Sequence, residues 1–256
     1  MTSITDTFLH YQAPEKLLQD KIILVTGAGD GIGKVAALSF AQHGATVVLL
    51  GRTLSKLERV YDEIESLGGP QPAIFPMNLE GAGEHEYQAM HDTLNEEFGR
   101  LDGILFNAAQ LGPRTPIANY AFSEWQKVLQ VNVTSPFLMV KSMLPLLNQS
   151  QSASILFTGS SVGRTGRAYW GGYAVSKAAT ENLMQILADE YESSSHIRVN
   201  SINPGAVRTK MRATAYPAEN PGTVTDPHSI MNRYLYLMGD DSRAVNGQQF
   251  DAQPKA

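Results

Sequence analysis

The amino-acid sequence predicts an α/β fold: a single doubly wound parallel sheet with helices on both of its faces. Short apolar runs alternate with segments of helical periodicity from residue 21 onward, which is typical of parallel strands joined by right-handed crossovers. A glycine-rich turn directly follows the first apolar run, where such sheets bind phosphates. The 256 residues contain no internal repeat, low-complexity tract or linker. We therefore expect one domain over 1–256, with a polar N-terminal extension at 1–20.

The first strand and the helix after it are the clearest elements. Lys21–Val25 is a short apolar run of the kind that is buried on both faces of a parallel sheet. Gly33–Gly44 has a broad apolar face and ends on a glycine, as many helices do. Later elements follow from the same periodicities. Strands are predicted at 45–50, 73–77, 101–106, 154–158, 197–202 and 248–251, and helices at 55–67 and 87–98.

Two stretches depart from this alternation. Residues 123–146 are predicted to form helical structure that is interrupted or bent near Pro136, because proline lacks the amide hydrogen that a helix interior needs. Residues 209–226 contain prolines and little apolar periodicity, so we expect a loop-rich insert that serves as the substrate loop. Loops on a rigid scaffold commonly carry specificity.

The composition excludes several classes of partner. Twenty basic and twenty-five acidic residues give a formal net charge of −5 and a pI near 5.7, so no basic field attracts nucleic acid or an anionic membrane. The absence of cysteine excludes thiolate catalysis and cysteine-ligated metal, and we expect no metal site. No segment resembles a membrane span or a secretory leader. These features predict a cytoplasmic protein without nucleic-acid or membrane partners.

The turn at 26–33, TGAGDGIG, lies between the first strand and the first helix. Its glycines permit positive φ and a close approach of the backbone to a pyrophosphate, while free amides and the helix dipole favour the anion. Alone, such a turn is also compatible with an ordinary tight connection. Whether it is a dinucleotide site therefore depends on the rest of the sequence.

Tyr173 and Lys177 are four residues apart in the stretch YAVSK. On a helix this spacing places both side chains on one face, where the ammonium favours the tyrosinate. Free tyrosine has a pKa of about 10 and is a poor base near neutrality, so acid–base chemistry requires such a neighbour. Without further signals, the pair is more often two neighbours on a solvated helix face.

Two other strand ends supply those signals. Residues 157–163 run from a strand into a polar turn, and Ser160 lies thirteen residues before Tyr173. This count favours Ser160 over the adjacent Ser161. Residues 200–209 close another strand with a Pro-Gly turn and a hydroxyl. Ligands of open α/β sheets bind beyond the carboxyl ends of the strands, so we expect these groups to face one cleft.

With these motifs in this order, the sequence resembles the short-chain dehydrogenase/reductase family over residues 21–251. The matched stretches are TGAGDGIG (26–33), FNAA (106–109), VNV (131–133), GSSVG (159–163), YAVSK (173–177) and NPGAVRT (203–209). Two longer stretches, VGRTGRAYWGGYAVSK and YLMGDDSRAVNGQQFDAQP, look like a bacterial subgroup, the YciK-type oxidoreductases. The resemblance implies a Rossmann-like fold that binds a nicotinamide dinucleotide.

The resemblance also implies a role for each matched residue. Tyr173 would be the acid/base, and Lys177 would hold the nicotinamide ribose and lower the pKa of the tyrosine. Ser160 would steady the substrate oxygen, and Asn132 would continue a proton relay through water. Such donors suit hydride transfer from nicotinamide C4, because the developing alkoxide needs a hydrogen bond and a proton. The implied cofactor-binding residues are Tyr173, Lys177, Gly27, Gly31, Ile32, Gly33, Arg52, Asn78, Leu79, Asn107, Ala108, Pro204, Gly205, Val207 and Thr209.

Two positions depart from the family pattern. Ala109 stands where the family usually has glycine, which removes a flexible residue near the adenine ribose. Asn78 stands where the family usually has aspartate, and its amide oxygen can still accept from the adenine amino group. Both departures concern cofactor affinity rather than the reacting atoms.

The end of the second strand favours NADP(H). NAD-specific sheets place an acidic residue there, which binds both ribose hydroxyls and repels a 2′-phosphate. This chain has Gly51, followed by Arg52 with a planar fork of donors suited to phosphate. Gly29 and Asp30 argue the other way, because relatives often have a phosphate-binding serine at the first and the second adds negative charge. We expect NADP(H) to be preferred, with NAD(H) still possible.

The predicted function is hydride transfer between NADP(H) and a small-molecule carbonyl or alcohol substrate. A non-catalytic NADP(H)-binding regulatory protein is the main alternative, although a regulator has no need of Ser160, Tyr173 and Lys177 together. An epimerase or dehydratase that retains its nucleotide is a second alternative, but such relatives usually carry a longer C-terminal substrate region. The sequence identifies neither the substrate nor the preferred direction.

The substrate pocket and the assembly are the remaining expectations. The pocket is expected from 111–115, from 164–170 and from the loop after Thr209. Tyr169 and Trp170 suggest an aromatic wall, while Arg164 and Arg167 are either contacts to an anionic group or ordinary exposed side chains. The family resemblance implies a homodimer or homotetramer assembled through the helices that contain Asn132 and Tyr173, with 248–254 at another contact.

Overall fold

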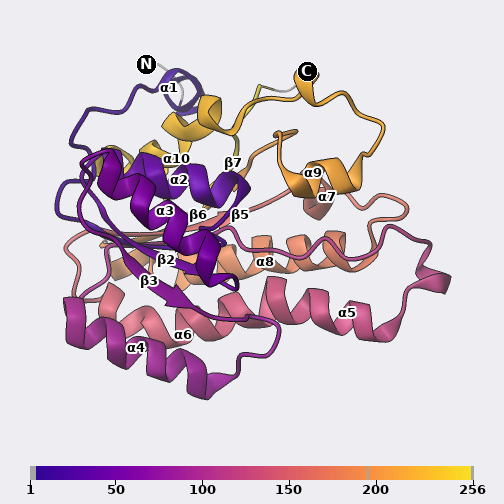
Figure 1. The fold of residues 1–256 in the computed structure, drawn as a ribbon, viewed down its shortest axis with the longest axis horizontal. Coiled ribbons are helices and arrows are strands. Elements are labelled where there is room, and N and C mark those ends of the chain that lie inside the picture. Colours follow the sequence, from indigo (N-terminus) through magenta and orange to yellow (C-terminus); the bar gives the residue numbers. More distant parts are fainter. Residues whose placement is uncertain (1–3, 195, 255–256) are drawn as a thin grey trace.

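The computed structural model describes residues 4–194 and 196–254, and its centre is a seven-stranded parallel sheet (Figure 1). The strand order is β3-β2-β1-β4-β5-β6-β7, so the chain winds outward first in one direction and then in the other. This is the predicted doubly wound arrangement. The strands are β1 (Ile22–Thr26), β2 (Thr46–Gly51), β3 (Ala73–Pro76), β4 (Gly103–Phe106), β5 (Ala153–Thr158), β6 (Ile197–Asn203) and β7 (Gln249–Asp251).

Strand β1 is an inner strand of the sheet, and it is buried along its whole length. All five of its residues are buried. It pairs on one side with β2, where Leu24 lies opposite Val48, and on the other with β4, where Leu24 lies opposite Ile104. The winding direction therefore reverses at the carboxyl end of β1, which is where sheets of this kind bind ligands.

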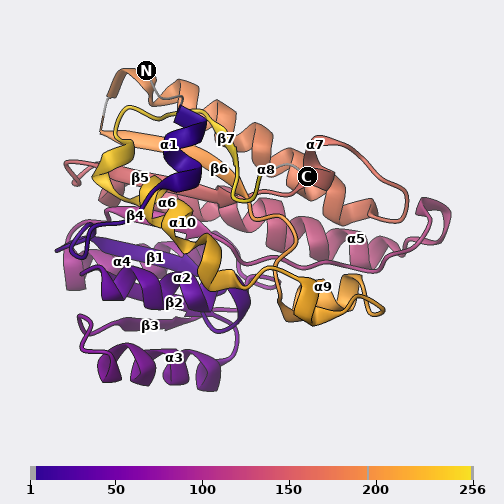
Figure 2. The same cartoon turned by 90° about the horizontal axis from the view of Figure 1, so that it is seen from above.

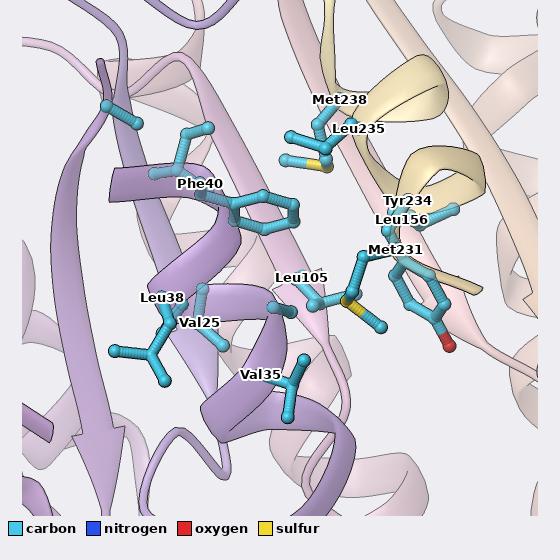
Figure 3. Packing of buried hydrophobic residues seen from close by; sticks show 14 of the residues in the cluster. Val25, Val35, Leu38, Phe40, Leu105, Leu156, Met231, Tyr234, Leu235 and Met238 are labelled. Carbon is cyan, nitrogen blue, oxygen red and sulfur yellow. The ribbon is translucent and has the colours of Figure 1, made fainter. Parts of the chain in front are cut away.

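Helices cover both faces of the sheet (Figures 1 and 2). Side chains of α2 and α10, among them Phe40, Tyr234 and Met238, pack on one face over Val25 and Leu105 (Figure 3). A second apolar cluster joins the other face to α4, α6 and α8. The helices are α1 (Ile4–His10), α2 (Gly31–Gln42), α3 (Leu54–Ser66), α4 (Glu84–Phe98), α5 (Phe122–Leu129), α6 (Ser135–Leu147), α7 (Ser161–Arg164), α8 (Gly171–Glu190), α9 (Lys210–Ala215) and α10 (Met231–Met238).

The predicted interruption of the helix at 123–146 lies one turn earlier than expected. Helix α5 passes into α6 through a π-helical turn at Gln130–Thr134. Pro136 follows directly in the first turn of α6, and it lacks the amide hydrogen that would bond back into the π turn. The irregularity thus centres on Asn132 instead of the proline, and π turns of this kind are frequent at functional sites.

The N-terminal segment is part of the core and does not extend away from it. Phe8, in α1, is 1% exposed, and its ring lies 4.5 Å from that of Phe250 in β7 and 6.0 Å from that of Tyr236 in α10. The Tyr11 hydroxyl donates to Asp241 at 2.6 Å. Residues 1–3 of the predicted extension lie outside the described residues. The two ends of the described chain therefore pack together.

The predicted loop-rich insert at 209–226 contains more regular structure than expected. Helix α9 begins after Thr209, whose hydroxyl accepts a hydrogen bond from the Arg212 amide at 3.1 Å. Val207 and Thr225 form an isolated β-bridge across the base of the segment.

Candidate active site

A cavity of about 470 Å³ opens at the carboxyl ends of the strands. Residues that end or directly follow β1 to β6 form much of its wall. Two predicted residues, Gly33 and Asn132, are not part of its lining. The other predicted residues line it: Gly27, Gly31, Ile32, Arg52, Asn78, Leu79, Asn107, Ala108, Ser160, Tyr173, Lys177, Pro204, Gly205, Val207 and Thr209.

The glycine-rich turn brings the start of α2 close to the end of β1. Gly27 and Gly31 have φ values of 71° and 55°, in the left-handed region that favours glycine. A Cβ on Gly33 would lie 2.3 Å from the carbonyl oxygen of Gly27, so only glycine fits behind the turn. Asp30 caps the helix by accepting from the Gly31 amide at 2.9 Å. The helix N-terminus is thus aimed at the cavity, which suits an anion such as a pyrophosphate.

The Thr26 side chain connects the glycine-rich turn to the end of β4 through hydrogen bonds. Its hydroxyl oxygen accepts hydrogen bonds from the backbone amides of Asn107 and Ala108, at 3.0 Å each. The same hydroxyl donates to the carbonyl of Leu105 at 3.3 Å. The Cβ position of Gly27 lies 3.0 Å from the Ala108 Cα, so the two strand ends are in close contact. The cavity wall around the glycine-rich turn is therefore built mainly from backbone.

The charges near the end of β2 favour an anion. Arg52 is exposed, lines the cavity and has no ion-pair partner among the described residues. Asp30 does have partners: Lys56 Nζ lies 2.6 Å and Lys210 Nζ 3.3 Å from its carboxylate. The hydrogen bond from Lys56 is the main reason that the pKa of Asp30 is lowered. The negative charge that argued against a phosphate site is thus compensated, while Arg52 is left available.

Asn78 is held in a local turn after β3. Its amide oxygen accepts from the Glu80 backbone amide at 3.3 Å. The Glu80 carboxylate in turn accepts from the Gln110 side chain at 2.9 Å, which joins this turn to the segment after β4. An amide oxygen has two lone pairs, so one remains for the adenine contact expected of Asn78.

Tyr173, Lys177 and Glu181 lie on successive turns of α8. The Lys177 ammonium is buried, donates to the Thr158 carbonyl at 2.7 Å and lies 5.7 Å from the centre of the Tyr173 ring. Burial lowers the pKa of Lys177 to about 8, and the charge of Glu181 opposes this shift. The predicted pair is thus assembled on one helix face, as its spacing indicates.

The ionisation of Tyr173 differs from the expectation. Burial raises the pKa of its hydroxyl to about 12, against which a hydrogen bond with Ser160 acts. Lys177 was expected to lower the pKa of Tyr173, but in this structure desolvation is the larger influence. Tyr173 is therefore held in the protonated form, which is the form that donates a proton to a carbonyl oxygen.

Ser160 is the cavity serine, as the spacing to Tyr173 predicted. It lines the cavity, whereas Ser161 is exposed and borders a separate hollow. The glycines on either side allow this approach to α8. A Cβ on Gly159 would lie 2.3 Å from the Glu181 carboxylate, and one on Gly163 would lie 2.7 Å from the Lys177 Cβ. The two glycines therefore let the Ser160 turn pack directly on the helix of Tyr173.

Asn132 lies behind the cavity wall, in the π turn. Its side-chain oxygen accepts from the Gln110 amide at 2.8 Å, and its nitrogen donates to the Gln110 carbonyl and the Ser176 hydroxyl at 2.9 Å each. Ser176 in turn donates to the Tyr173 carbonyl. The Asn132 side chain thus positions the segment after β4 against the helix of Tyr173, and its predicted relay role stays a prediction.

The turn after β6 is held by a residue that the sequence analysis did not single out. The Gln253 side chain donates to the carbonyls of Pro204 and Ala206 at 2.8 and 3.0 Å and accepts from Thr225 at 2.8 Å. Gly205 has a φ of 74°, and a Cβ there would lie 2.8 Å from Gln253. The predicted NPG turn is therefore positioned by a contact distant in sequence, which no local motif reveals.

Aromatic and basic side chains from three separate segments meet beside Tyr173. Trp170 and Tyr216 line the cavity with ring centres 6.0 Å apart. Arg114 stacks on both rings, at 4.5 Å and 4.9 Å, and donates to the Ala215 carbonyl. We call Arg114, Trp170 and Tyr216 the aromatic clamp. The sequence analysis named Trp170 for this wall. Arg114 lies within the predicted pocket segment 111–115, and Tyr216 lies in the predicted loop after Thr209, but neither residue was named.

The other residues considered for the substrate pocket lie elsewhere. Arg164 pairs with Asp251 at 2.8 Å and with Glu181 at 3.6 Å. Arg167 and Tyr169 are exposed and do not line the cavity. An anionic substrate therefore finds neither arginine in this site. The sequence analysis did not single out Lys56, which lies in the first turn of α3, lines the cavity and pairs with Asp30.

Within residues 4–194 and 196–254, no cluster of three or more metal-ligating side chains is present. No helix of that same part of the chain is long and apolar enough to cross a membrane.

Comparisons with known proteins agree with this geometry. Residues 21–220 match the family model described as short chain dehydrogenase. The chain is 50% identical over 246 residues to the uncharacterized oxidoreductase YciK of Escherichia coli K12, which covers 96% of this chain and 97% of that protein. The crystal structure of YciK superposes with a TM-score of 0.93, covering 96% and 100% of the two chains. A 49% identical protein of Escherichia coli CFT073, solved in complex with NADPH, gives a TM-score of 0.92 and covers 94% and 100%.

Proposed function

The chain belongs to the short-chain dehydrogenase/reductase family, and from that premise we propose that it is an NADP(H)-dependent oxidoreductase acting on a carbonyl or alcohol group. One observation carries this proposal. Tyr173, its hydrogen-bond partner Ser160 and the buried Lys177 face the same cavity as the glycine-rich turn. A proton donor and a dinucleotide site in one cavity are what carbonyl reduction requires.

The lining fits a nicotinamide dinucleotide. Because residues 27, 31 and 33 are glycines, no side chain at these positions fills the space above the turn. The N-terminus of α2 faces this space. Arg52 is placed to bind a 2′-phosphate. When bound, the reduced cofactor supplies a hydride to the carbonyl carbon.

The residues of this chain then act on the oxygen. Tyr173 gives its proton to the developing alkoxide, while the Ser160 hydroxyl donates a hydrogen bond to the same oxygen. The Lys177 ammonium lies close enough to the tyrosine ring to favour the tyrosinate left behind. In the oxidative direction the same groups work in reverse, with Tyr173 accepting the proton of the alcohol.

The preference for NADP(H) is proposed from charge. Gly51 offers no carboxylate to repel a 2′-phosphate, and Arg52 is uncommitted. Asp30 is held by two lysines, so its charge is compensated. Relatives about half identical to this chain have been solved with NADP and with NADPH, which supports the same preference.

The experiment that tests the proposal is a carbonyl panel with NADPH. Stoichiometric oxidation of NADPH by at least one ketone or aldehyde, abolished in Tyr173→Phe, is the expected result. A regulatory protein would bind NADPH without consuming it, and an epimerase or dehydratase would return its nucleotide unchanged. Binding of NADPH with no consumption across the panel, and no reduction of NADP⁺ by the matching alcohols, would contradict the proposal.

We also propose a homodimer or homotetramer, formed through the helices that contain Asn132 and Tyr173. Support comes from large apolar side chains left exposed on α5, α6 and α8, namely Phe122, Phe137, Val175 and Ile186. Exposed apolar side chains clustered on a few helices commonly mark interfaces. Light scattering at micromolar concentration is the test, and a monomer alone would refute the assembly.

A further inference from the structure

The substrate side of the cavity is apolar and aromatic. Beyond Ser160 and Tyr173 its lining includes Leu111, Trp170, Met211, Ala215 and Tyr216. The ring of Trp170 lies 5.8 Å from that of Tyr173 and 6.0 Å from that of Tyr216. Aromatic surface thus continues from the proton donor across to α9.

Arg114 holds this surface in place from outside the cavity. It does not line the cavity, yet its guanidinium stacks on both clamp rings and donates to the Ala215 carbonyl. A cation over an aromatic face stabilises that arrangement. Trp170 and Tyr216 are therefore positioned before a substrate arrives, which reduces the entropy lost on binding.

The basic residues between 208 and 212 form ion pairs with carboxylates. Arg212, which lines the cavity, donates twice to Glu219 at 2.6 Å and stacks 3.8 Å over the Tyr216 ring. The hydrogen bond to Glu219 is the first cause of its raised pKa. Lys210 pairs with Asp30 and Arg208 with Asp226. An anionic substrate that approached Arg212, Lys210 or Arg208 would have to displace the carboxylate partner of that residue.

Building on the proposed function, we propose that the substrate is an uncharged carbonyl or alcohol compound that carries an aromatic or alicyclic ring. Its ring lies against Trp170 and Tyr216, and its oxygen reaches Tyr173 and Ser160. A carboxylate on the same ring would face Arg212 only after Glu219 is lost, so the Arg212–Glu219 pair sets the charge selectivity of the site.

The test compares 4-methylacetophenone with 4-acetylbenzoate, which share ring and ketone and differ in a methyl and a carboxylate. With NADPH, wild-type kcat/KM should favour the neutral ketone by at least about tenfold, because burying an unpaired carboxylate is costly. Glu219→Gln leaves the Arg212 charge unbalanced and should reduce that preference several-fold. Glu190→Gln, exposed at the end of α8, is the matched control and should keep it. Equal or reversed wild-type preference, or an unchanged ratio in Glu219→Gln, would overturn the inference.

A binding measurement separates this inference from the proposed function. Trp125 and Trp170 are the two tryptophans of the chain, so a Trp125→Phe variant reports on Trp170 alone. In that variant with NADP⁺, 4-methylacetophenone should change the fluorescence at lower concentration than 4-acetylbenzoate. If NADPH is oxidised with neither ketone, the proposed function is contradicted for these substrates. The relative affinities of the two ketones still test the proposed substrate class. Tighter binding of the carboxylate overturns the inference even if both ketones are reduced.

Discussion

The two sides of the active-site cavity are built in different ways. The proposed cofactor side consists of strand ends and the glycine-rich turn, where backbone packs on backbone, as at Gly27 and Ala108. The substrate side consists of side chains from separate loops, joined by the stacking of Arg114 between Trp170 and Tyr216. The first is fixed by the sheet itself, whereas the second depends on contacts between loops. Changes on the cofactor side should therefore disturb folding and nucleotide binding together, while changes on the substrate side should alter selectivity alone.

The largest effect is expected at Tyr173, where the two sides meet. Tyr173→Phe removes the proton donor while keeping the ring, so kcat should fall by about 100- to 10,000-fold with NADPH affinity retained. Tyr216→Phe is the control, because it also removes a hydroxyl from a cavity ring and should keep kcat nearly unchanged. Steady-state kinetics and NADPH titration measure both. Wild-type turnover in Tyr173→Phe would remove the proposed mechanism.

A methyl group added in the glycine-rich turn should lower both the stability of the protein and its affinity for NADPH. Gly33→Ala forces a Cβ to within 2.3 Å of the Gly27 oxygen, so stability should fall by about 1–3 kcal/mol or more, and NADPH affinity should fall with it. Gly81→Ala, whose added Cβ meets nothing within 4 Å, should do neither. Thermal unfolding with and without NADPH makes the comparison. Identical behaviour of the two variants would show that the tight turn is unimportant.

Arg52→Ala separates charge from backbone on the same side. Loss of a charge-assisted phosphate contact should cost about 1.5–3 kcal/mol of NADPH binding and leave NADH binding unchanged. Arg59→Ala, an exposed arginine of α3 outside the cavity lining, is the control. Titration of each variant with both reduced cofactors gives the result. Equal weakening of NADPH and NADH, or equal wild-type affinity for them, would contradict the assignment.

The pH dependence tests the helix that joins the two sides. Lys177 has a pKa of about 8 and Tyr173 one of about 12, so both are protonated below about pH 8, and above it Lys177 loses its charge first. Reduction should therefore have a constant kcat/KM below about pH 8 and a falling one above it. Glu181→Gln removes the charge that raises the pKa of Lys177, so the fall should begin at lower pH. Glu190→Gln should leave the pH profile of kcat/KM unchanged. An unshifted pH profile in Glu181→Gln would show that Glu181 does not influence the pKa of Lys177.

The smallest effect is expected from the aromatic clamp. Arg114→Ala removes cation–π contacts worth about 0.5–2 kcal/mol, so KM for an aromatic ketone should rise several-fold, with NADPH affinity and thermal stability nearly unchanged. Arg167→Ala, close to Trp170 but outside the lining, should have no such effect. A loss of NADPH binding in Arg114→Ala would show that the two sides are not independent.

The same contrast explains which features the sequence predicted. The strands begin and end within one or two residues of the predicted positions, because the spacing of apolar residues and the glycines of turns are local features of the sequence. Tyr173, Lys177 and Ser160 were also predictable, since helical spacing and a strand end bring them to the cavity. Burial of the N-terminal Phe8 was not predictable, because its partners come at the far end of the sequence.

Other misses have the same origin. Asn132, in the π turn, bonds to Gln110 and Ser176, and no local sequence pattern distinguishes such a turn from a proline bend. Arg164 was considered for an anionic ligand, but its charge is taken by Asp251, which follows much later in the chain. Side-chain contacts between distant segments therefore decide what a residue does, and these contacts depend on the finished fold.

The packing of the two chain ends has a consequence for synthesis on the ribosome. Tyr11 bonds to Asp241 across 230 residues, and Gln253 holds the turn at Pro204. A chain emerges N-terminus first, so Phe8 remains without its aromatic partners until Tyr236 and Phe250 have been synthesised. The NPG turn likewise acquires its support only when residue 253 leaves the exit tunnel. The proposed nucleotide site is thus completed late, and a prematurely terminated chain would expose apolar surface of the kind that chaperones and proteases recognise.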